Sequence, residues 1–266
     1  MTREELTSYL IGQFQNWDLA RLNFEALKNV ERKPFEAGDL KGYIQFNPAR
    51  AVSTLAKVDA ANIEKRKCFL CKTNRPSEQK SFEIIPDWEL LVNPFPILPF
   101  HFTIASKNHF PQTLEIETGR KLSRVLVGMA VFYNGDGAGA SAPDHAHFQA
   151  VKKRDLPLIR LLDKNWNENF ENLNLPFRIF KNPTDANIEK KAVNAFFWVS
   201  EGEERWILIK RKSHRPKEFF LDPPFRRAVS PGAIDLAGVI VTPFKEDFIA
   251  LTSEEVKDIY HQVSDE

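Results

Sequence analysis

One stretch near the middle of the chain constrains its fold more than any other. Residues 132–150 have the sequence FYNGDGAGASAPDHAHFQA. This stretch ends in an alternating segment in which single apolar residues separate His145, His147 and Gln149. Because alternate side chains of an extended strand share a face, we predict a strand that presents the two histidines and the glutamine in a row.

The first half of the same stretch is a loop rich in Gly, Ala and Ser. It follows an apolar run at residues 125–133, which fits either a helix or a buried strand. The free backbone N–H groups of such a loop can hold an anion, so Asn134, Gly139 and Ser141 are candidate phosphate contacts; a flexible linker is the alternative. A nucleophilic imidazole beside a phosphate cradle is what nucleotidyl transfer through a covalent histidine needs. No Gly-x-x-x-x-Gly-Lys occurs, which excludes a P-loop.

The segment resembles the active-site strand of the histidine-triad (HIT) superfamily. It is most similar to the transferase branch, which includes galactose-1-phosphate uridylyltransferase, diadenosine tetraphosphate phosphorylase and GDP-L-galactose phosphorylase. That branch has His-x-His-x-Gln, which stands here as His145, His147 and Gln149, where the hydrolase branch has a third histidine. The resemblance covers roughly residues 65–245. It implies an α+β fold: a HIT-like antiparallel sheet with flanking helices and two pseudo-repeated lobes.

The resemblance gives His147 the role of the catalytic nucleophile. The alternative is a strand histidine that only bonds a backbone carbonyl. A neutral imidazole can attack the α-phosphorus of a nucleotide if a carbonyl holds its other nitrogen and so determines the tautomer. Gln149 can donate to a phosphate oxygen but has no titratable proton, so it favours acceptors that arrive already ionised. This favours a transferase over a hydrolase.

Cys68 and Cys71 form a Cys-x-x-Cys pair. Two buried cysteines, a redox pair and half of a tetrahedral zinc site are all compatible with it. In galactose-1-phosphate uridylyltransferases such a pair binds zinc together with a histidine after a strand and the first histidine of His-x-His. The matching residues here are His109 and His145, and the resemblance therefore implies a structural zinc.

Two further groups are candidate substrate contacts. Asn93 and Phe95 resemble the Asn-Asp-Phe segment that holds the nucleoside in the uridylyltransferases, although Pro94 replaces the acid; a structural proline-rich turn is the alternative. Lys153 belongs to a basic run that could meet the phosphate of the second substrate, and a solvated basic face is the alternative. His214 and Arg215 occupy the place in a faint internal repeat that corresponds to the end of the strand at residues 101–106.

We expect three parts: a helical N-terminal extension (1–60), a HIT-like catalytic lobe (61–155), and a second, degenerate HIT-like lobe with a C-terminal helix (156–266). Apolar periodicity predicts helices at 3–29, 113–129 and 253–263 and a buried helix within 231–241. Thr2 with Glu5 fits a capping box for the first helix, and Thr252 or Ser253 caps the last. The pattern predicts strands at 82–92, with a turn near Pro86, and at 101–106, 195–199 and 206–210, the last two joined as a hairpin by a turn that begins at Glu201.

Composition restricts the partners. A net charge of +1 gives no reason to expect nucleic acid or an anionic membrane. No apolar run approaches the roughly 20 residues that span a bilayer, and the first residues show no signal pattern, so the expected location is the cytoplasm. A homodimer is compatible with the sequence, which does not determine the oligomeric state.

These observations predict a nucleotidyltransferase or phosphorylase that acts on a nucleotide sugar or a dinucleoside polyphosphate, with phosphate or a sugar phosphate as acceptor. A hexose-1-phosphate uridylyltransferase is the alternative enzyme. A zinc-stabilised module that binds nucleotides without turnover is the alternative from another class. The base and the sugar stay open, since no motif here reports on them.

Overall fold

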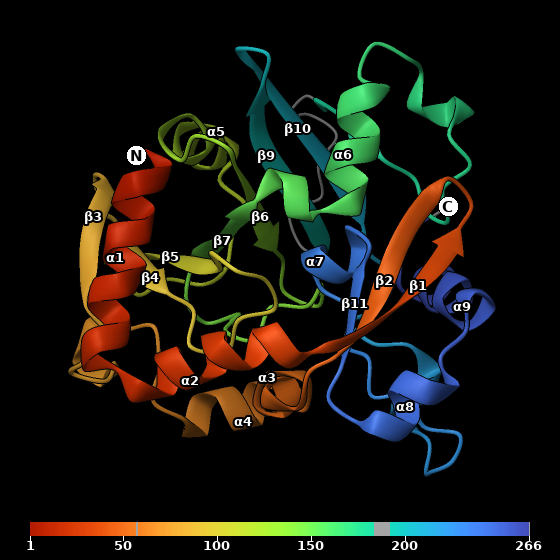
Figure 1. The fold of residues 1–266 in the computed structure, drawn as a ribbon, viewed down its shortest axis with the longest axis horizontal. Helices are drawn as coiled ribbons and strands as arrows, with labels where there is room; N and C mark the ends of the chain where they lie inside the picture. Colours follow the sequence, from red (N-terminus) through yellow and green to blue (C-terminus); the bar gives the residue numbers. More distant parts are fainter. Residues whose placement is uncertain (57, 184–191, 266) are drawn as a thin grey trace.

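The computed structural model describes residues 1–56, 58–183 and 192–265. In this part of the chain two sheets form the centre of the protein (Figure 1). The larger sheet has the order β3-β4-β5-β7-β6-β9-β10-β8, and the smaller has the order β1-β2-β11. The strands are β1 (Glu31–Ala37), β2 (Leu40–Phe46), β3 (Ser81–Ile85), β4 (Trp88–Val92), β5 (Phe102–Ser106), β6 (Met129–Asn134), β7 (His147–Lys152), β8 (Phe180–Lys181), β9 (Val193–Ser200), β10 (Glu203–Lys210) and β11 (Val239–Thr242).

Helices cover both faces of this arrangement, with α1 beside β3 and β4 and with α8 and α9 beside the smaller sheet (Figure 1). They are α1 (Arg3–Asn16), α2 (Asp18–Ala26), α3 (Ala51–Thr54), α4 (Ala60–Lys65), α5 (Ile116–Val125), α6 (Pro157–Lys164), α7 (Ala233–Leu236), α8 (Lys245–Ala250) and α9 (Ser253–Val263). None of the helices in the described ranges is both long enough and apolar enough to cross a bilayer.

The predicted α+β fold with an antiparallel sheet is confirmed. Neighbouring strands of the larger sheet pair antiparallel, whereas β11 pairs parallel to β2 in the smaller one. Strand β6 pairs with β9, so the strands of both predicted lobes lie in one continuous sheet. The division of the chain into three parts stays a prediction.

Strand β7 separates two hydrophobic cores. Phe148 and Ala150 pack into the core that contains residues of α1 and α5, whereas Val151 packs into the core of the smaller sheet. Because side chains alternate along a strand, His147 and Gln149 lie on the same face as Val151. His147 and Gln149 therefore face the layer formed by α7 and the smaller sheet. The predicted row of three is correct only for these two residues, because β7 begins at His147 and the ring of His145, which precedes the strand, lies beside Cys68 instead.

Local signals in the sequence predicted several elements correctly. Thr2 and Thr252 begin α1 and α9 with capping boxes, in which a glutamate three residues later bonds back to the cap. Glu201 and Gly202 join β9 to β10 with φ values of 54° and 81°, which is the backbone of the tight two-residue hairpin turn. The strands within 82–92 and 101–106 are also present, with Asp87 in the turn of the first pair.

Other predictions of secondary structure were wrong in part. The expected helix at 3–29 is interrupted at Trp17, whose backbone is extended and whose ring is buried. Residues 1–60 are not only helical, because β1 and β2 form a hairpin there. The segment 231–241 gives a one-turn helix and then β11, and the helix expected at 113–129 covers only α5. The apolar run at 125–133 forms mainly the fully buried β6, so the strand alternative holds.

Gly119 shows how tightly α5 packs on the sheet. A Cβ atom built there would lie 2.5 Å from the ring of Phe197, which is fully buried, whereas one at Gly12 in α1 would meet nothing within 4 Å. We expect Gly119→Ala to lower the free energy of unfolding by about 1–2 kcal/mol through overpacking. Gly12→Ala is the matched control and should raise it by up to about 1 kcal/mol, since alanine favours a helix interior. Denaturant unfolding of both variants measures the difference; equal stabilities would contradict the packing.

Candidate active site

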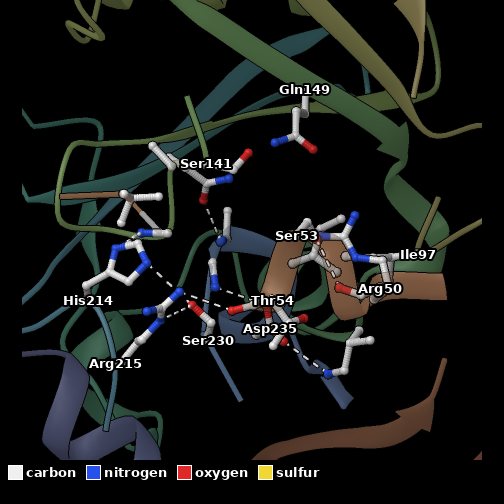
Figure 2. Close-up of a pocket in the computed structure, with 18 of the residues that line it drawn as sticks. Arg50, Ser53, Thr54, Ile97, Ser141, Gln149, His214, Arg215, Ser230 and Asp235 are labelled. Atoms are coloured by element: carbon white, nitrogen blue, oxygen red, sulfur yellow. Dashed lines mark hydrogen bonds between the residues drawn. The ribbon is translucent and has the colours of Figure 1, made fainter. Parts of the chain in front are cut away.

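A small cavity lies between the larger sheet and the layer that covers it (Figure 2). Gln149, Phe132 and Asn134 line it from the sheet, and Asp235 and Val241 line it from α7 and β11. The remaining lining residues come from segments far apart in sequence: Arg50, Ser53, Thr54, Val58, Ile97, Gly139, Ala140, Ser141, His214, Arg215, Ser230, Gly232, Ala233 and Ile234. The cavity therefore brings Gln149 of the predicted motif together with residues from the N-terminal and C-terminal parts of the chain.

The ring of His147 has a defined tautomer. Nδ1 lies 2.8 Å from the backbone carbonyl of His145, and a carbonyl can only accept, so Nδ1 carries the proton. Nε2 is left with a free lone pair and has no hydrogen-bond partner in the described part of the chain. Burial lowers the pKa of His147 to about 4, so the ring is neutral at pH 7. The residue is 4% exposed and does not itself line the cavity.

Gln149 is oriented by His101. The Ile97 N–H donates to Nδ1 of His101 (3.1 Å), so the single proton of the neutral ring is on Nε2. That nitrogen lies 2.7 Å from Oε1 of Gln149. If the Gln149 amide were flipped, its NH₂ group would face the Nε2–H of His101, and two donors would lie against each other. The amide nitrogen of Gln149 must therefore point away from His101, and Gln149 lines the cavity (Figure 2).

Gln112 holds the start of β7 in place through hydrogen bonds. No feature of the sequence indicated this role. Its Oε1 accepts from the backbone N–H of His147 (2.7 Å), and its Nε2 donates to the carbonyls of His147 and Asn134 (2.9 Å each). The side chain thus joins the end of β6 to the start of β7. A single glutamine between helix and strand carries no pattern that could reveal this role.

The glycine-rich loop reaches the cavity, and its contact with phosphate stays a prediction. Gly139 has φ +92°, and a Cβ atom there would lie 2.6 Å from Cα of Gly232, so only glycine allows this approach. Its N–H donates to Nδ1 of His214 (3.3 Å). Asn134, which lines the cavity, accepts on Oδ1 from the side chain of Asn194 and from the backbone N–H of Ala233. Ser141 also lines the cavity.

The four predicted metal ligands meet at one point. The ligand atoms of Cys68, Cys71, His109 and His145 all lie within 4.8 Å of one another. His145 donates from Nε2 to the carbonyl of Ser106 (2.9 Å), so its Nδ1 lone pair faces the sulfur of Cys68 at 3.3 Å. Two thiols and two imidazoles in this arrangement fit a tetrahedral metal ion, and the cluster could hold one.

The structure does not bring Asn93, Phe95 or Lys153 to the cavity. Oδ1 of Asn93 accepts from the backbone N–H of Phe95 (3.0 Å) and so closes the turn after β4. The ammonium group of Lys153 contacts Asp163, Ser200 and a backbone carbonyl. The nucleoside role of the first two and the phosphate role of the lysine stay predictions.

Sequence reasoning missed most of the charged residues in the cavity. Arg50 comes from the N-terminal segment to which no role was assigned, and Asp235 comes from α7. His214 and Arg215 do reach the site, as their place in the internal repeat suggested. Burial is the main cause of the shifted pKa values here: it lowers that of His214 to about 4 and raises that of Asp235 to about 6.

Comparisons with known proteins agree on the fold. A family model described as a domain of unknown function (DUF4922) matches residues 9–152, which is just over half of the chain. No curated protein sequence matches significantly. The crystal structure of yeast Ap4A phosphorylase Apa2 in complex with Ap4A has a TM-score of 0.60 at 16% identity and covers 99% of this chain and 98% of that one. The complex of the same enzyme with AMP has a TM-score of 0.59 at 16% identity, with 94% and 96% covered. The similarity at this identity shows a common fold.

The buried state of His101 should appear in acid unfolding. Burial, with a smaller effect of Arg50, lowers its pKa from 6.5 to about 3. The unfolded chain therefore binds a proton below pH 6.5 that the folded chain does not, and stability falls as the pH falls through this window. Between pH 7 and pH 5 we expect a loss of about 2 kcal/mol from this residue.

His101→Gln tests this prediction against the wild-type protein. Glutamine cannot titrate in this pH range, but it keeps an N–H donor near the position of Nε2. Its unfolding free energy, measured in denaturant at both pH values, should depend less steeply on pH by about that amount. Equal pH dependence in the two proteins would show that His101 is protonated in the folded state.

Proposed function

The chain belongs to the DUF4922 family, and we propose that it is a nucleotidyltransferase of the phosphorylase type that forms a covalent nucleotidyl group on His147. The donor is a dinucleoside polyphosphate or a nucleotide sugar, and the acceptor is phosphate or a sugar phosphate. One observation carries the proposal. The Nδ1 proton of His147 is held by the carbonyl of His145, which leaves a neutral nucleophile at Nε2 beside Gln149.

The reaction has two balanced steps. In the first, Nε2 attacks the α-phosphorus, an N–P bond forms, and the P–O bond to the leaving phosphate oxygen breaks. The ring then carries a positive charge, which the Nδ1–H bond to the His145 carbonyl stabilises. In the second step an acceptor oxyanion attacks the same phosphorus and the N–P bond breaks, which restores the neutral ring. This is a double displacement through a covalent histidine.

The orientation of Gln149 supports transfer to an ionised acceptor. Its Oε1 is occupied by His101, so the group that it presents to the cavity is a donor. A donor can stabilise charge on a phosphate oxygen, but it cannot remove a proton from water. An acceptor that is already an oxyanion needs no such base. The sequence argument for transferase over hydrolase therefore gains a geometric basis.

The similar structures favour one donor class over the other. They are complexes of yeast Ap4A phosphorylase with Ap4A and with AMP, and the whole chain matches that fold. We therefore place a dinucleoside polyphosphate before a nucleotide sugar. A hexose-1-phosphate uridylyltransferase stays the alternative enzyme. A cytoplasmic location and a homodimer stay predictions from the sequence.

We propose zinc as the ion of the Cys/His cluster. Thiolate and imidazole ligands suit zinc, and four protein ligands leave no open position for water, so the role is structural. His145 connects the cluster to the reaction, because its ring belongs to the cluster and its carbonyl holds His147. Zinc would fix the position of that carbonyl.

Cys68→Ser tests this assignment. We expect the purified variant to retain at most about a tenth of the zinc of the wild-type protein, measured by elemental analysis, and to unfold at a lower temperature. His101→Gln serves as the control, since it changes a buried histidine outside the cluster. A Cys68→Ser protein that kept both its metal and its stability would contradict a structural zinc site.

A covalent adduct tests the enzyme assignment directly. We expect incubation with labelled Ap4A, followed by a quench, to leave an acid-labile nucleotidyl group on His147. His147→Asn keeps a donor for the His145 carbonyl but has no nucleophile, so it should form no adduct and lose at least about 10³-fold in turnover. If the wild-type protein formed no adduct with Ap4A or with any nucleotide sugar, the nucleotide-binding module would be the better description.

A further inference from the structure

Two guanidinium groups in the cavity have hydrogen-bonding capacity that the protein does not use. We infer that Arg50 and Arg215 form a subsite for a second phosphate group, distinct from the one transferred to His147. The inference rests on the proposed function and names a ligand class for this part of the cavity. The ligand is inorganic phosphate or the terminal phosphate of a nucleoside polyphosphate.

Arg50 is the more deeply placed of the two. It ends a short 3-10 helix (Pro48–Arg50), and its Nη1 donates to the carbonyl of Phe95 at 2.6 Å. Its Nε is fully buried without a partner, and Nη2 makes no hydrogen bond in the described ranges. An arginine offers five N–H donors, so most of the donors of Arg50 have no acceptor in the described part of the chain. The side chain lines the cavity, which is where a ligand would meet them (Figure 2).

Arg215 is held from the opposite side of the cavity (Figure 2). Its Nε donates to Oγ of Ser230 (3.1 Å), and its Nη2 donates to the carbonyls of Thr54 (3.1 Å) and Ala56 (2.8 Å). The guanidinium also lies 4.1 Å from the ring centre of Phe219. These contacts fix the group but leave Nη1 without a protein partner among the described residues. The partners that hold it are all neutral.

The charges around the cavity do not balance. Arg50, Arg211 and Arg215 make no ion pair with any carboxylate in the described part of the chain; Arg211 donates to carbonyl and amide oxygens. Asp235 is the acidic residue of the lining, and both its oxygens accept backbone N–H groups, from Gly232 and Val241. A buried charge without a counter-charge is costly. A bound anion would offset this excess of positive charge.

The size of the cavity fits such an anion. It encloses about 60 Å³ of space open to groups the size of water, and one water needs about 10–15 Å³ of such space. There is room for a few water molecules or for one tetrahedral oxyanion. The guanidinium group binds phosphate oxygens in pairs and stays charged when buried, so two arginines select a phosphate over a neutral hydroxyl group.

The geometry of displacement at phosphorus lets one subsite serve both steps. The attacking and leaving atoms lie roughly in line at the phosphorus, so the leaving phosphate departs opposite Nε2. The acceptor attacks the same phosphorus to break the N–P bond, and it must approach along the same path. Gln149, which shares a strand face with His147, lines the same cavity as the two arginines.

Arg50→Met and Arg215→Met test the subsite in the full-length protein. We expect each to raise the KM for inorganic phosphate in Ap4A phosphorolysis at least tenfold. AMP carries only the transferred phosphate, so its affinity should stay within twofold, whereas that of ADP should fall at least tenfold. Arg50→Lys, which keeps the charge but not the paired donors, should be intermediate. Arg160→Met removes an exposed arginine of α6 and is the matched control.

Unchanged AMP affinity also shows that the variants are folded. If phosphate KM and ADP affinity both stayed within twofold in folded variants, the subsite would be overturned. A rise in the phosphate KM alone assigns the subsite to the free acceptor, and a loss of ADP affinity alone assigns it to the nucleotide. Equal weakening of AMP and ADP would also overturn it, because the arginines would then act on the first phosphate or on the fold.

Binding measurements separate this inference from the proposed function. If the wild-type protein formed no adduct with any donor, the enzyme assignment would fail. Calorimetry with AMP, ADP and inorganic phosphate would still decide whether the arginines hold a second phosphate. A wild-type protein that bound ADP no more tightly than AMP, and did not bind phosphate, would contradict the subsite itself.

Discussion

The hydrogen bond from Nδ1 of His147 to the backbone carbonyl of His145 is the interaction on which the site depends. It determines the tautomer of the neutral ring and leaves Nε2 with a free lone pair, as the proposed nucleophile requires. It also connects two parts of the protein, because the ring of His145 belongs to the Cys/His cluster while its carbonyl holds His147. Displacement of His145 would therefore affect the cluster and the ring of His147 together.

A second chain of hydrogen bonds determines what Gln149 can do. The backbone N–H of Ile97 sets the tautomer of His101, and His101 then sets the orientation of the Gln149 amide. Both histidines act as neutral groups because burial lowers their pKa values well below 7. The positive charge of the cavity comes instead from arginines, which stay charged when buried. Neutral donors and fixed cations together form a site suited to anions.

The sequence predicted the class of fold and the local elements with strong signals, such as the β9–β10 hairpin and the capped helix α9. It placed His147 and Gln149 on one face because strand spacing determines their separation, whereas His145 precedes β7 and its ring joins the Cys/His cluster. It did not predict that α7 is a single turn followed by β11, because apolar residues buried all round show no periodicity. The role of Gln112 also had no signal, since it depends on two strand ends meeting.

The sequence by itself identified the proposed nucleophile and three residues of the Cys/His cluster, because short spacings and residue chemistry reveal a Cys-x-x-Cys and a His-x-His; the fourth, His109, came from the family resemblance. The tertiary structure alone decided which cations line the cavity. Lys153 is close to the motif in sequence, yet its ammonium is engaged by Asp163 and Ser200. Arg50 and Arg215 come from segments far apart in the sequence, and both line the cavity. The physical reason is that long-range electrostatics depends on where the layers bring charges together, and no local pattern of residues encodes that position.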